Sequence, residues 1–154
     1  SRQELDGETG MKGMIITHLK EIQDDRGSIL HMLRADEKDF DTFGECYFSE
    51  INPGKVKAWK CHSRQSQNIS VPVGKIRLVL FDERSNSSTK NKLQILELGR
   101  PDNYKRVHIP KGIWYGFKCL SNMPAIIANC ADIPHEREES EIRPPNHSKI
   151  PYQF

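Results

Sequence analysis

The feature that most constrains the fold of this chain is the regular alternation of short strand-like segments with turn signals. From Ile15 onward, segments rich in β-branched and aromatic residues are separated by clusters of Gly, Pro, Asn, Asp and Ser. The clearest turn signals are Asp24-Asp25-Arg26-Gly27, Asn52-Pro53-Gly54, Val73-Gly74, Arg84-Ser85-Asn86-Ser87-Ser88, Gly99-Arg100-Pro101-Asp102 and Pro110-Lys111-Gly112. This spacing predicts an all-β sandwich or barrel.

Two segments are especially strong strand candidates, and helix signals are weak. Residues 75–82 are a strong strand candidate, and residues 125–128 are a second, more fully buried one. No segment repeats apolar residues at helical spacing over three turns, although residues 34–40 have the composition for one short helical turn. We therefore expect an antiparallel barrel or flattened sandwich with minimal helix.

Length and charge limit the domain organisation and the partners. The chain has 154 residues, which suits one domain, and we expect residues 11–154 to form it. Residues 1–10 lack apolar periodicity and are interpreted as a disordered tail or a non-native remnant ahead of Met11. Lys and Arg number 23 against 21 Asp and Glu, and they are scattered, so we expect neither a nucleic acid nor a membrane partner. The expected location is cytoplasmic.

Two motifs on this strand-like sequence resemble those of the cupin barrels. The first has the order Gly, five residues, His, one residue, His, then a Glu and a second Gly, and the second has the order Pro, Gly, His, Asn. The matching positions in this chain are Gly54, Lys60, His62, Gln67 and Gly74 for the first motif, and Pro110, Gly112, Tyr115 and Cys119 for the second. Glycines at such spacings are individually common, but the two motifs in order make the resemblance specific.

The residues at these positions favour a cavity that holds no metal. Lys60 and His62 lie two apart on one expected strand, so their side chains face the same side, and Gln67 returns on the next strand. A cupin metal is bound by three His and one Glu, whereas this chain has Lys60, His62, Gln67 and Tyr115 at those places. An ammonium group has no lone pair, and Gln is a weak neutral ligand. We therefore expect no metal and no other cofactor.

Longer stretches of the chain resemble the dTDP-4-dehydrorhamnose 3,5-epimerase family, which has the RmlC-like cupin fold. The resemblance covers the chain from about Met11 to Tyr152, including an Asp-x-Arg-Gly element at residues 24–27. The stretches that carry it are residues 43–84, 109–121 and 142–152. The resemblance implies an intertwined homodimer and a nucleotide-linked 4-keto-6-deoxy sugar as substrate. It also implies epimerisation beside the ketone, in polysaccharide or deoxysugar biosynthesis.

The resemblance assigns roles to individual residues. It places Arg26 and Lys57 at basic positions that bind the diphosphate, and we add Gln67 as a substrate-binding residue. Lys60 occupies the place of the family's catalytic histidine. Epimerisation requires a base, a group that stabilises the enolate, and an acid on the opposite face.

Two more positions complete the predicted catalytic set. Tyr115 replaces the histidine of the family's His-Gly-Phe triplet, and Asn146 lies near the place of the aspartate that orients the catalytic histidine. The predicted catalytic residues are therefore Lys60, His62, Tyr115 and Asn146.

Each of these residues also has a structural interpretation. Lys60 would otherwise be a solvated strand lysine, His62 a hydrogen-bonded structural imidazole, and Tyr115 an amphipathic core residue. Trp59 and Trp114 are expected to pack in the barrel wall or at a dimer interface. The charge run at residues 136–141 is expected to be a solvated face.

Two hypotheses about function follow from the sequence. In the first, the protein is a metal-independent epimerase or isomerase of a nucleotide-linked 4-keto-6-deoxy sugar, with Lys60, His62 and Tyr115 as a rearranged acid/base set. In the second, it is a catalytically inactive cupin that only binds a nucleotide sugar or a protein partner. Solvent deuterium exchange on a nucleotide 4-keto-6-deoxyhexose distinguishes the two.

Overall fold

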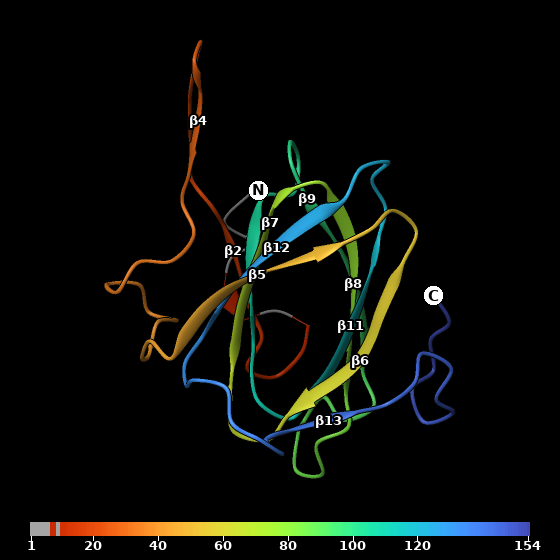
Figure 1. The fold of residues 1–154 in the computed structure, drawn as a ribbon. Coiled ribbons are helices and arrows are strands. Elements are labelled where there is room, and N and C mark those ends of the chain that lie inside the picture. Colours follow the sequence, from red (N-terminus) through yellow and green to blue (C-terminus); the bar gives the residue numbers. More distant parts are fainter. Residues whose placement is uncertain (1–6, 9) are drawn as a thin grey trace.

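Two antiparallel sheets packed face to face form the body of the protein (Figure 1). The computed structural model describes residues 7–8 and 10–154. The first sheet contains, in spatial order, β1 (Gly7–Glu8), β2 (Ile15–His18), β10 (Lys105–Ile109), β7 (Gln67–Val73), β12 (Ala125–Ala131) and β5 (Glu45–Ile51). The second contains β13 (Ser140–Ile142), β6 (Val56–His62), β11 (Ile113–Cys119), β8 (Lys75–Asp82) and β9 (Leu93–Gly99). A separate two-stranded sheet consists of β3 (Glu21–Asp24) and β4 (Gly27–Leu30).

The predicted fold class is confirmed. Within the described residues every element is a strand and every strand pair is antiparallel, so the architecture is an all-β jelly roll. Residues 34–40, whose composition would allow one short helical turn, form successive tight turns. The described chain contains no helix of the length and apolarity that crossing a membrane requires. Most of the predicted tail, residues 1–10, lies outside the described residues, but Gly7–Glu8 pairs with β2.

β8 shows why one segment was so easily predicted as a strand. Leu78 and Leu80 point inward to the core between the sheets, while Val79 and Phe81 point outward to a second apolar cluster. Because both faces of β8 are buried along its second half, the four residues from Leu78 to Phe81 are all apolar rather than alternating.

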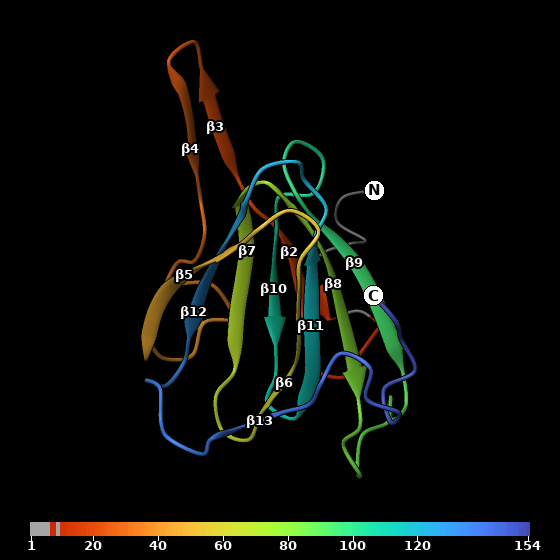
Figure 2. The ribbon, with the colours of Figure 1, turned by 45° about the vertical axis from the view of Figure 1, so that its right-hand side comes forward.

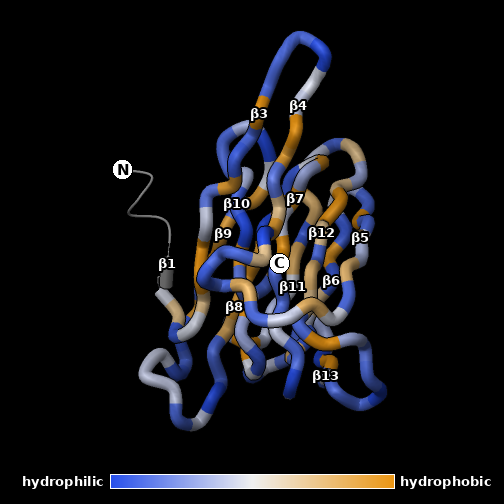
Figure 3. Tube along the Cα trace, turned by 90° about the vertical axis from the view of Figure 1, so that its left-hand side faces the viewer, coloured by the Kyte–Doolittle hydropathy of each residue, from blue (hydrophilic) through white to orange (hydrophobic). Residues whose placement is uncertain are grey.

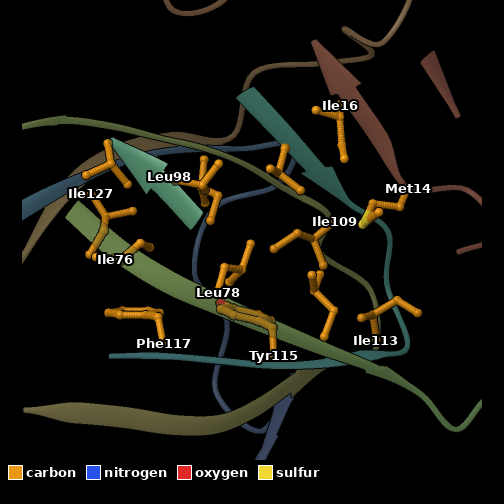
Figure 4. Packing of buried hydrophobic residues seen from close by; sticks show 14 of the residues in the cluster. Met14, Ile16, Ile76, Leu78, Leu98, Ile109, Ile113, Tyr115, Phe117 and Ile127 are labelled. Atoms are coloured by element: carbon orange, nitrogen blue, oxygen red, sulfur yellow. The ribbon is translucent and has the colours of Figure 1, made fainter. Parts of the chain in front are cut away.

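The main core fills the space between the two sheets. Figure 4 shows part of it, with Leu78, Tyr115 and Phe117 of the second sheet turned toward the interior, where Ile109 and Ile127 of the first sheet also lie. The Tyr115 ring therefore belongs to the core even though its hydroxyl is polar. Burial of these side chains is the dominant stabilising contribution to the fold.

The C-terminal segment covers the outer face of the second sheet. Trp59 and Trp114 lie there with Ile150, and Tyr152 and Phe154 pack against them. Arg143 holds the segment in place, since its guanidinium stacks 4.0 Å above the Trp114 ring and pairs with Glu83. The two tryptophans thus pack in the barrel wall, as one of the two sequence interpretations predicted.

The β3–β4 hairpin projects away from the barrel (Figures 1 and 2). It turns through the two residues Asp25 and Arg26, as the turn signal at residues 24–27 predicted. Its apolar cross-strand pair, Ile22 and Ile29, is exposed, and the hairpin carries apolar positions among hydrophilic ones in Figure 3.

A buried arginine fixes the connection from this hairpin to β5. Arg106 on β10 is fully buried, and its Nη2 lies 2.8 Å from a carboxylate oxygen of Asp39 and 2.8 Å from one of Glu37. It also donates to the backbone carbonyl of Met32. Since a buried guanidinium requires such partners, residues 32–39 are held against the first sheet.

The pairing of β6 with β11 contains a bulge. Tyr115 pairs with Lys60 and Phe117 with Lys57, so the β6 segment is one residue longer than its partner. At this point the strands approach closely, because a methyl group on Gly116 would lie 2.5 Å from Ala58 Cβ. Glycine at position 116 is therefore required by packing rather than by its backbone angles.

We predict that Gly116→Ala destabilises the protein by about 1–3 kcal/mol, the usual effect of overpacking. Urea unfolding measures this. The double variant Gly116→Ala/Ala58→Gly removes the clashing methyl group and should recover part of the loss. Equal destabilisation in the single and double variants would contradict the assignment of the effect to this contact.

Candidate active site

A cavity of about 310 Å³ opens between the two sheets. From the first sheet it is lined by Tyr47, Ser49, Ile69, Ile127 and Asn129. From the second sheet it is lined by Lys57, Ala58, Trp59, Lys60, Tyr115, Phe117 and Ile142. Its volume lies at the lower end of the range for small-molecule sites, and a mainly apolar lining with a few polar groups is typical of them.

Two lysines lie on the second-sheet wall of the cavity. Lys57 and Lys60 are three apart, a separation that in a regular strand would place them on opposite faces, but the β6 bulge brings both to the cavity. Lys57 Nζ donates to the Glu50 carbonyl oxygen at 2.7 Å and to Ser49 Oγ at 3.3 Å. In the described part of the chain Lys60 has no hydrogen bond or ion pair, so its ammonium group is available to a ligand.

Tyr115 connects this wall to a buried hydrogen-bonded chain. The Tyr115 hydroxyl lies 3.2 Å from His62 Nε2, and His62 Nδ1 lies 2.7 Å from Glu139 Oε1. The other carboxylate oxygen of Glu139 accepts from the backbone N–H groups of Arg64 and Gln65. An ionised carboxylate only accepts, so Nδ1 carries the imidazole proton and Nε2 accepts from the Tyr115 hydroxyl.

The burial of this chain sets its protonation. Burial lowers the pKa of His62 below its ordinary value, although Glu139 partly opposes the shift, so His62 is neutral at pH 7. Burial raises the pKa of Tyr115, which keeps its phenol protonated. Burial also tends to raise the pKa of Glu139, but hydrogen bonds from His62 and the two backbone N–H groups outweigh it and lower that pKa to about 2. Along the hydrogen-bonded chain, Tyr115 is therefore a protonated phenol, His62 a neutral imidazole and Glu139 an ionised carboxylate.

The role of Glu139 corrects one sequence-based expectation. Residues 136–141 were interpreted as a solvated face, yet Glu139 is only 3% exposed and bonds to His62. Glu136, by contrast, is exposed, as expected. Glu139 directly precedes β13, whose pairing with β6 places it beside His62.

The first-sheet wall carries a second polar chain. Asn129 Nδ2 donates to the Tyr47 hydroxyl at 3.0 Å and also to Gln67 Oε1. Gln67 Nε2 donates to Gln65 Oε1, and Gln65 Nε2 donates to the Ile133 carbonyl oxygen at 2.7 Å. Gln67 therefore lies behind the cavity lining and orients Asn129, which lines the cavity.

The structure brings most of the predicted site residues together. Lys57, Lys60 and Tyr115 line the cavity, while His62 and Gln67 lie directly behind it, each bonded to a lining residue.

Arg26 and Asn146 lie outside this group. Arg26 is at the tip of the hairpin, paired with Asp24, and Asn146 is exposed on the C-terminal segment. The residue that bonds to His62 Nδ1 is Glu139 rather than Asn146.

Three polar residues of the site were not predicted from the sequence: Glu139, Tyr47 and Asn129. For Tyr47 a signal existed, because Tyr47, Ser49 and Ile51 alternate with residues of the opposite face, as in a half-buried strand. For Glu139 no local signal separates it from its acidic neighbours, since its partner is distant in the sequence.

The donor set of the cavity does not suit a metal ion. Among residues 7–8 and 10–154, no three His, Cys, Asp or Glu side chains are grouped closely enough to hold one. At the cupin ligand positions only His62 offers a common metal ligand, and both of its ring nitrogens already have protein partners. The absence of a cofactor stays a prediction.

We predict that Glu139→Gln lowers the free energy of unfolding at pH 7 by about 2–3 kcal/mol, because it removes a buried charge-assisted partner of His62. The pKa of Glu139 is lower in the folded state than the ordinary value of 4.5. Its stabilising effect is therefore complete above pH 4.5 and is lost as the pH falls toward about 2. Urea unfolding of both proteins from pH 7 to pH 3 should show the difference shrinking with acidity.

The matched control is Glu136→Gln, which changes an exposed carboxylate paired with Arg64. It should change stability by less than about 1 kcal/mol. A difference between wild type and Glu139→Gln that stays constant over the pH range would contradict the assigned hydrogen bond between His62 and an ionised Glu139.

Comparisons with known proteins agree with this geometry. A family model described as dTDP-4-dehydrorhamnose 3,5-epimerase matches residues 8–152. The spore coat polysaccharide biosynthesis protein SpsL of Bacillus subtilis strain 168 is 29% identical over 140 residues, which cover 91% of this chain and 89% of SpsL.

Solved structures share the fold over nearly the whole chain. The crystal structure of a dTDP sugar isomerase from Desulfovibrio desulfuricans G20 is 47% identical, with a TM-score of 0.91, and the match covers 93% of this chain and 91% of that one. The dTDP-4-dehydrorhamnose 3,5-epimerase of Bacillus anthracis strain Ames, with TDP and PPi bound, has a TM-score of 0.83 at 20% identity, covering 94% and 86%. This chain therefore belongs to the dTDP-4-dehydrorhamnose 3,5-epimerase family.

Proposed function

We propose that the protein is a metal-independent epimerase of a nucleotide-linked 4-keto-6-deoxy sugar that acts in polysaccharide or deoxysugar biosynthesis. The observation that carries this proposal is the second-sheet wall of the cavity, where Lys60, which has no ion-pair partner among the described residues, lies beside Tyr115. Tyr115 is bonded to His62, and His62 to Glu139. Family membership and the polysaccharide role of SpsL support the substrate class. The nucleotide is expected to be dTDP.

Lys60 is positioned to stabilise the enolate. Removal of a proton beside a ketone moves negative charge to the carbonyl oxygen, and a cation in an apolar cavity stabilises that charge more strongly than it would in water. Lys60 fulfils this requirement because no protein acceptor in the described chain competes for its ammonium group.

Tyr115 and His62 form the proton-transfer group of the same wall. As the Tyr115 oxygen takes the proton from carbon, the phenol proton passes to His62 Nε2. The imidazolium that forms is stabilised by Glu139, which already accepts from Nδ1. A neutral His62 is the form that this transfer requires, and burial lowers its pKa accordingly.

The diphosphate is assigned to basic side chains outside the reacting centre. Lys57 lies on the cavity wall and is held by Glu50 and Ser49. Arg26 is on the projecting hairpin, so we assign it to the cavity of a partner subunit in a homodimer. Exposed apolar side chains at Ile29 on that hairpin and at Phe48 on the edge strand β5 favour coverage by a second copy. A cytoplasmic location and the absence of nucleic acid and membrane partners remain predictions.

We predict that Lys60→Met reduces deuterium exchange from D2O into a dTDP-linked 4-keto-6-deoxyhexose by at least about a hundredfold. Methionine keeps most of the apolar stem, so the melting temperature should stay within a few degrees of wild type. NMR detection of deuterium at the carbons beside the ketone measures the exchange.

Lys118→Met is the matched control, because Lys118 is a half-buried lysine on β11 that does not line the cavity. It should exchange at the wild-type rate. An unchanged exchange rate in Lys60→Met would contradict the proposed catalytic role of Lys60. If the wild type binds the sugar nucleotide but exchanges no proton, the inactive binding module replaces the proposed function.

We also predict a homodimer in which Arg26 contacts the partner's ligand. Sedimentation at micromolar concentration should give twice the mass of the chain. Arg26→Gln should weaken dTDP binding by about tenfold in calorimetry, the effect of losing a charge-assisted contact of about 1.4 kcal/mol, without changing the dimer. A monomeric protein, or a dimer whose Arg26→Gln variant keeps full affinity, would contradict this assignment.

A further inference from the structure

Epimerisation requires proton transfer on both faces of one carbon, and the groups assigned above lie on one wall only. Lys60 and Tyr115 belong to the second sheet. A substrate carbon held between the sheets presents its opposite face to the first sheet. On that wall the lining residues with polar side chains are Tyr47, Ser49 and Asn129.

Tyr47 is the lining residue of that wall with a hydroxyl suited to proton transfer. It extends from β5, it is 38% exposed, and it lines the cavity together with Tyr115 of the other sheet. Its oxygen accepts a hydrogen bond from Asn129 Nδ2, but within the described residues its own O–H has no acceptor. The Tyr115 hydroxyl, in contrast, already faces His62. The proton of Tyr47 is therefore free to be donated to a ligand.

The chain of amides behind Tyr47 fixes its position. Asn129 is buried and its Nδ2 bridges Tyr47 and Gln67, while Gln67 is held by Gln65. The Asn129 amide is thus oriented by Gln67, and the Gln67 amide by Gln65. Gln65 in turn donates to the Ile133 carbonyl oxygen. A fixed donor to the Tyr47 oxygen stabilises the phenolate that forms when its proton leaves.

We propose that Tyr47 is the proton-transfer residue of the face opposite to Tyr115, and that Gln67 and Asn129 are its positioning residues. The group on the second-sheet wall takes the proton from carbon, and the C–H electron pair forms the enolate, whose oxygen faces Lys60. The Tyr47 O–H bond then breaks as its proton forms a new C–H bond on the other face and the carbonyl is restored. The Tyr47 phenolate then takes a proton from solvent, and the His62 imidazolium releases the abstracted proton to solvent, so both groups return to their starting states and the protons balance.

The environment of Tyr47 agrees with a donor role. Burial raises the pKa of Tyr47 above its ordinary value of 10.0, and Glu45 adds to the shift, while the hydrogen bond from Asn129 opposes it. The phenol is consequently protonated at neutral pH, as an acid must be before the step.

This inference rests on the proposed function, and Tyr47→Phe tests it separately. The variant and the wild type are incubated in D2O with a dTDP-linked 4-keto-6-deoxyhexose. NMR then measures two quantities: deuterium in the recovered substrate and the amount of inverted product. We expect inversion to fall at least about a hundredfold, while exchange into the substrate falls less than about tenfold, because the second-sheet wall still removes and returns protons on its own face.

Tyr152→Phe is the matched control, since Tyr152 packs on the outer face of the second sheet and lies outside the cavity. It should keep the wild-type ratio of inversion to exchange. Normal inversion in Tyr47→Phe would overturn the proposal, and so would an equal loss of exchange and inversion, which indicates a binding role. A wild type without any exchange would instead refute the proposed function itself.

Discussion

The pairing of β6 with β11 is the constraint on which the rest of the site depends. Three residues of β11, from Tyr115 to Phe117, span the same length as four of β6, from Lys57 to Lys60. The bulge is possible because Gly116 has no side chain where the strands meet. It turns both lysines to the cavity and keeps Tyr115 beside Lys60, so one local irregularity places two cations and a phenol on one wall.

Burial explains why the polar groups of this site occur in bonded chains. A neutral histidine and an ionised carboxylate are unfavourable inside an apolar barrel unless each is paired, and His62 and Glu139 satisfy one another. Asn129 and Gln67 follow the same rule on the other sheet. Lys60 is the exception, since no protein acceptor in the described chain satisfies it. A cation left unpaired at a cavity wall is the arrangement expected where a ligand supplies the negative charge.

The sequence predicted those features that depend on spacing within one or two strands. Residues 75–82 are β8 itself, and the interval between Lys60 and His62 predicted one shared face of β6, where Lys60 lines the cavity and His62 bonds to the lining residue Tyr115. Glu139 escaped prediction because its contact with His62 joins residues 77 apart, and its local sequence is that of an exposed acidic segment. Tyr47 lies in a segment with the alternation of a half-buried strand, but the family resemblance assigned a catalytic position to Tyr115 and none to Tyr47. Long-range packing, rather than local pattern, decides which polar residue of a strand becomes functional.

A jelly roll is well suited to epimerisation because its two sheets approach a bound sugar from opposite sides. In this chain the second sheet supplies Lys60 and Tyr115, and the first supplies Tyr47. The family resemblance places a catalytic histidine at position 60, where this chain has a lysine, and in the mechanism proposed above His62, behind Tyr115, accepts the proton instead. In that mechanism the imidazole does not contact the substrate directly, and the Tyr115 phenol transfers the proton between them. The proposed role of the Lys60 cation is to stabilise the enolate oxygen, which is a task that a metal ion would otherwise perform.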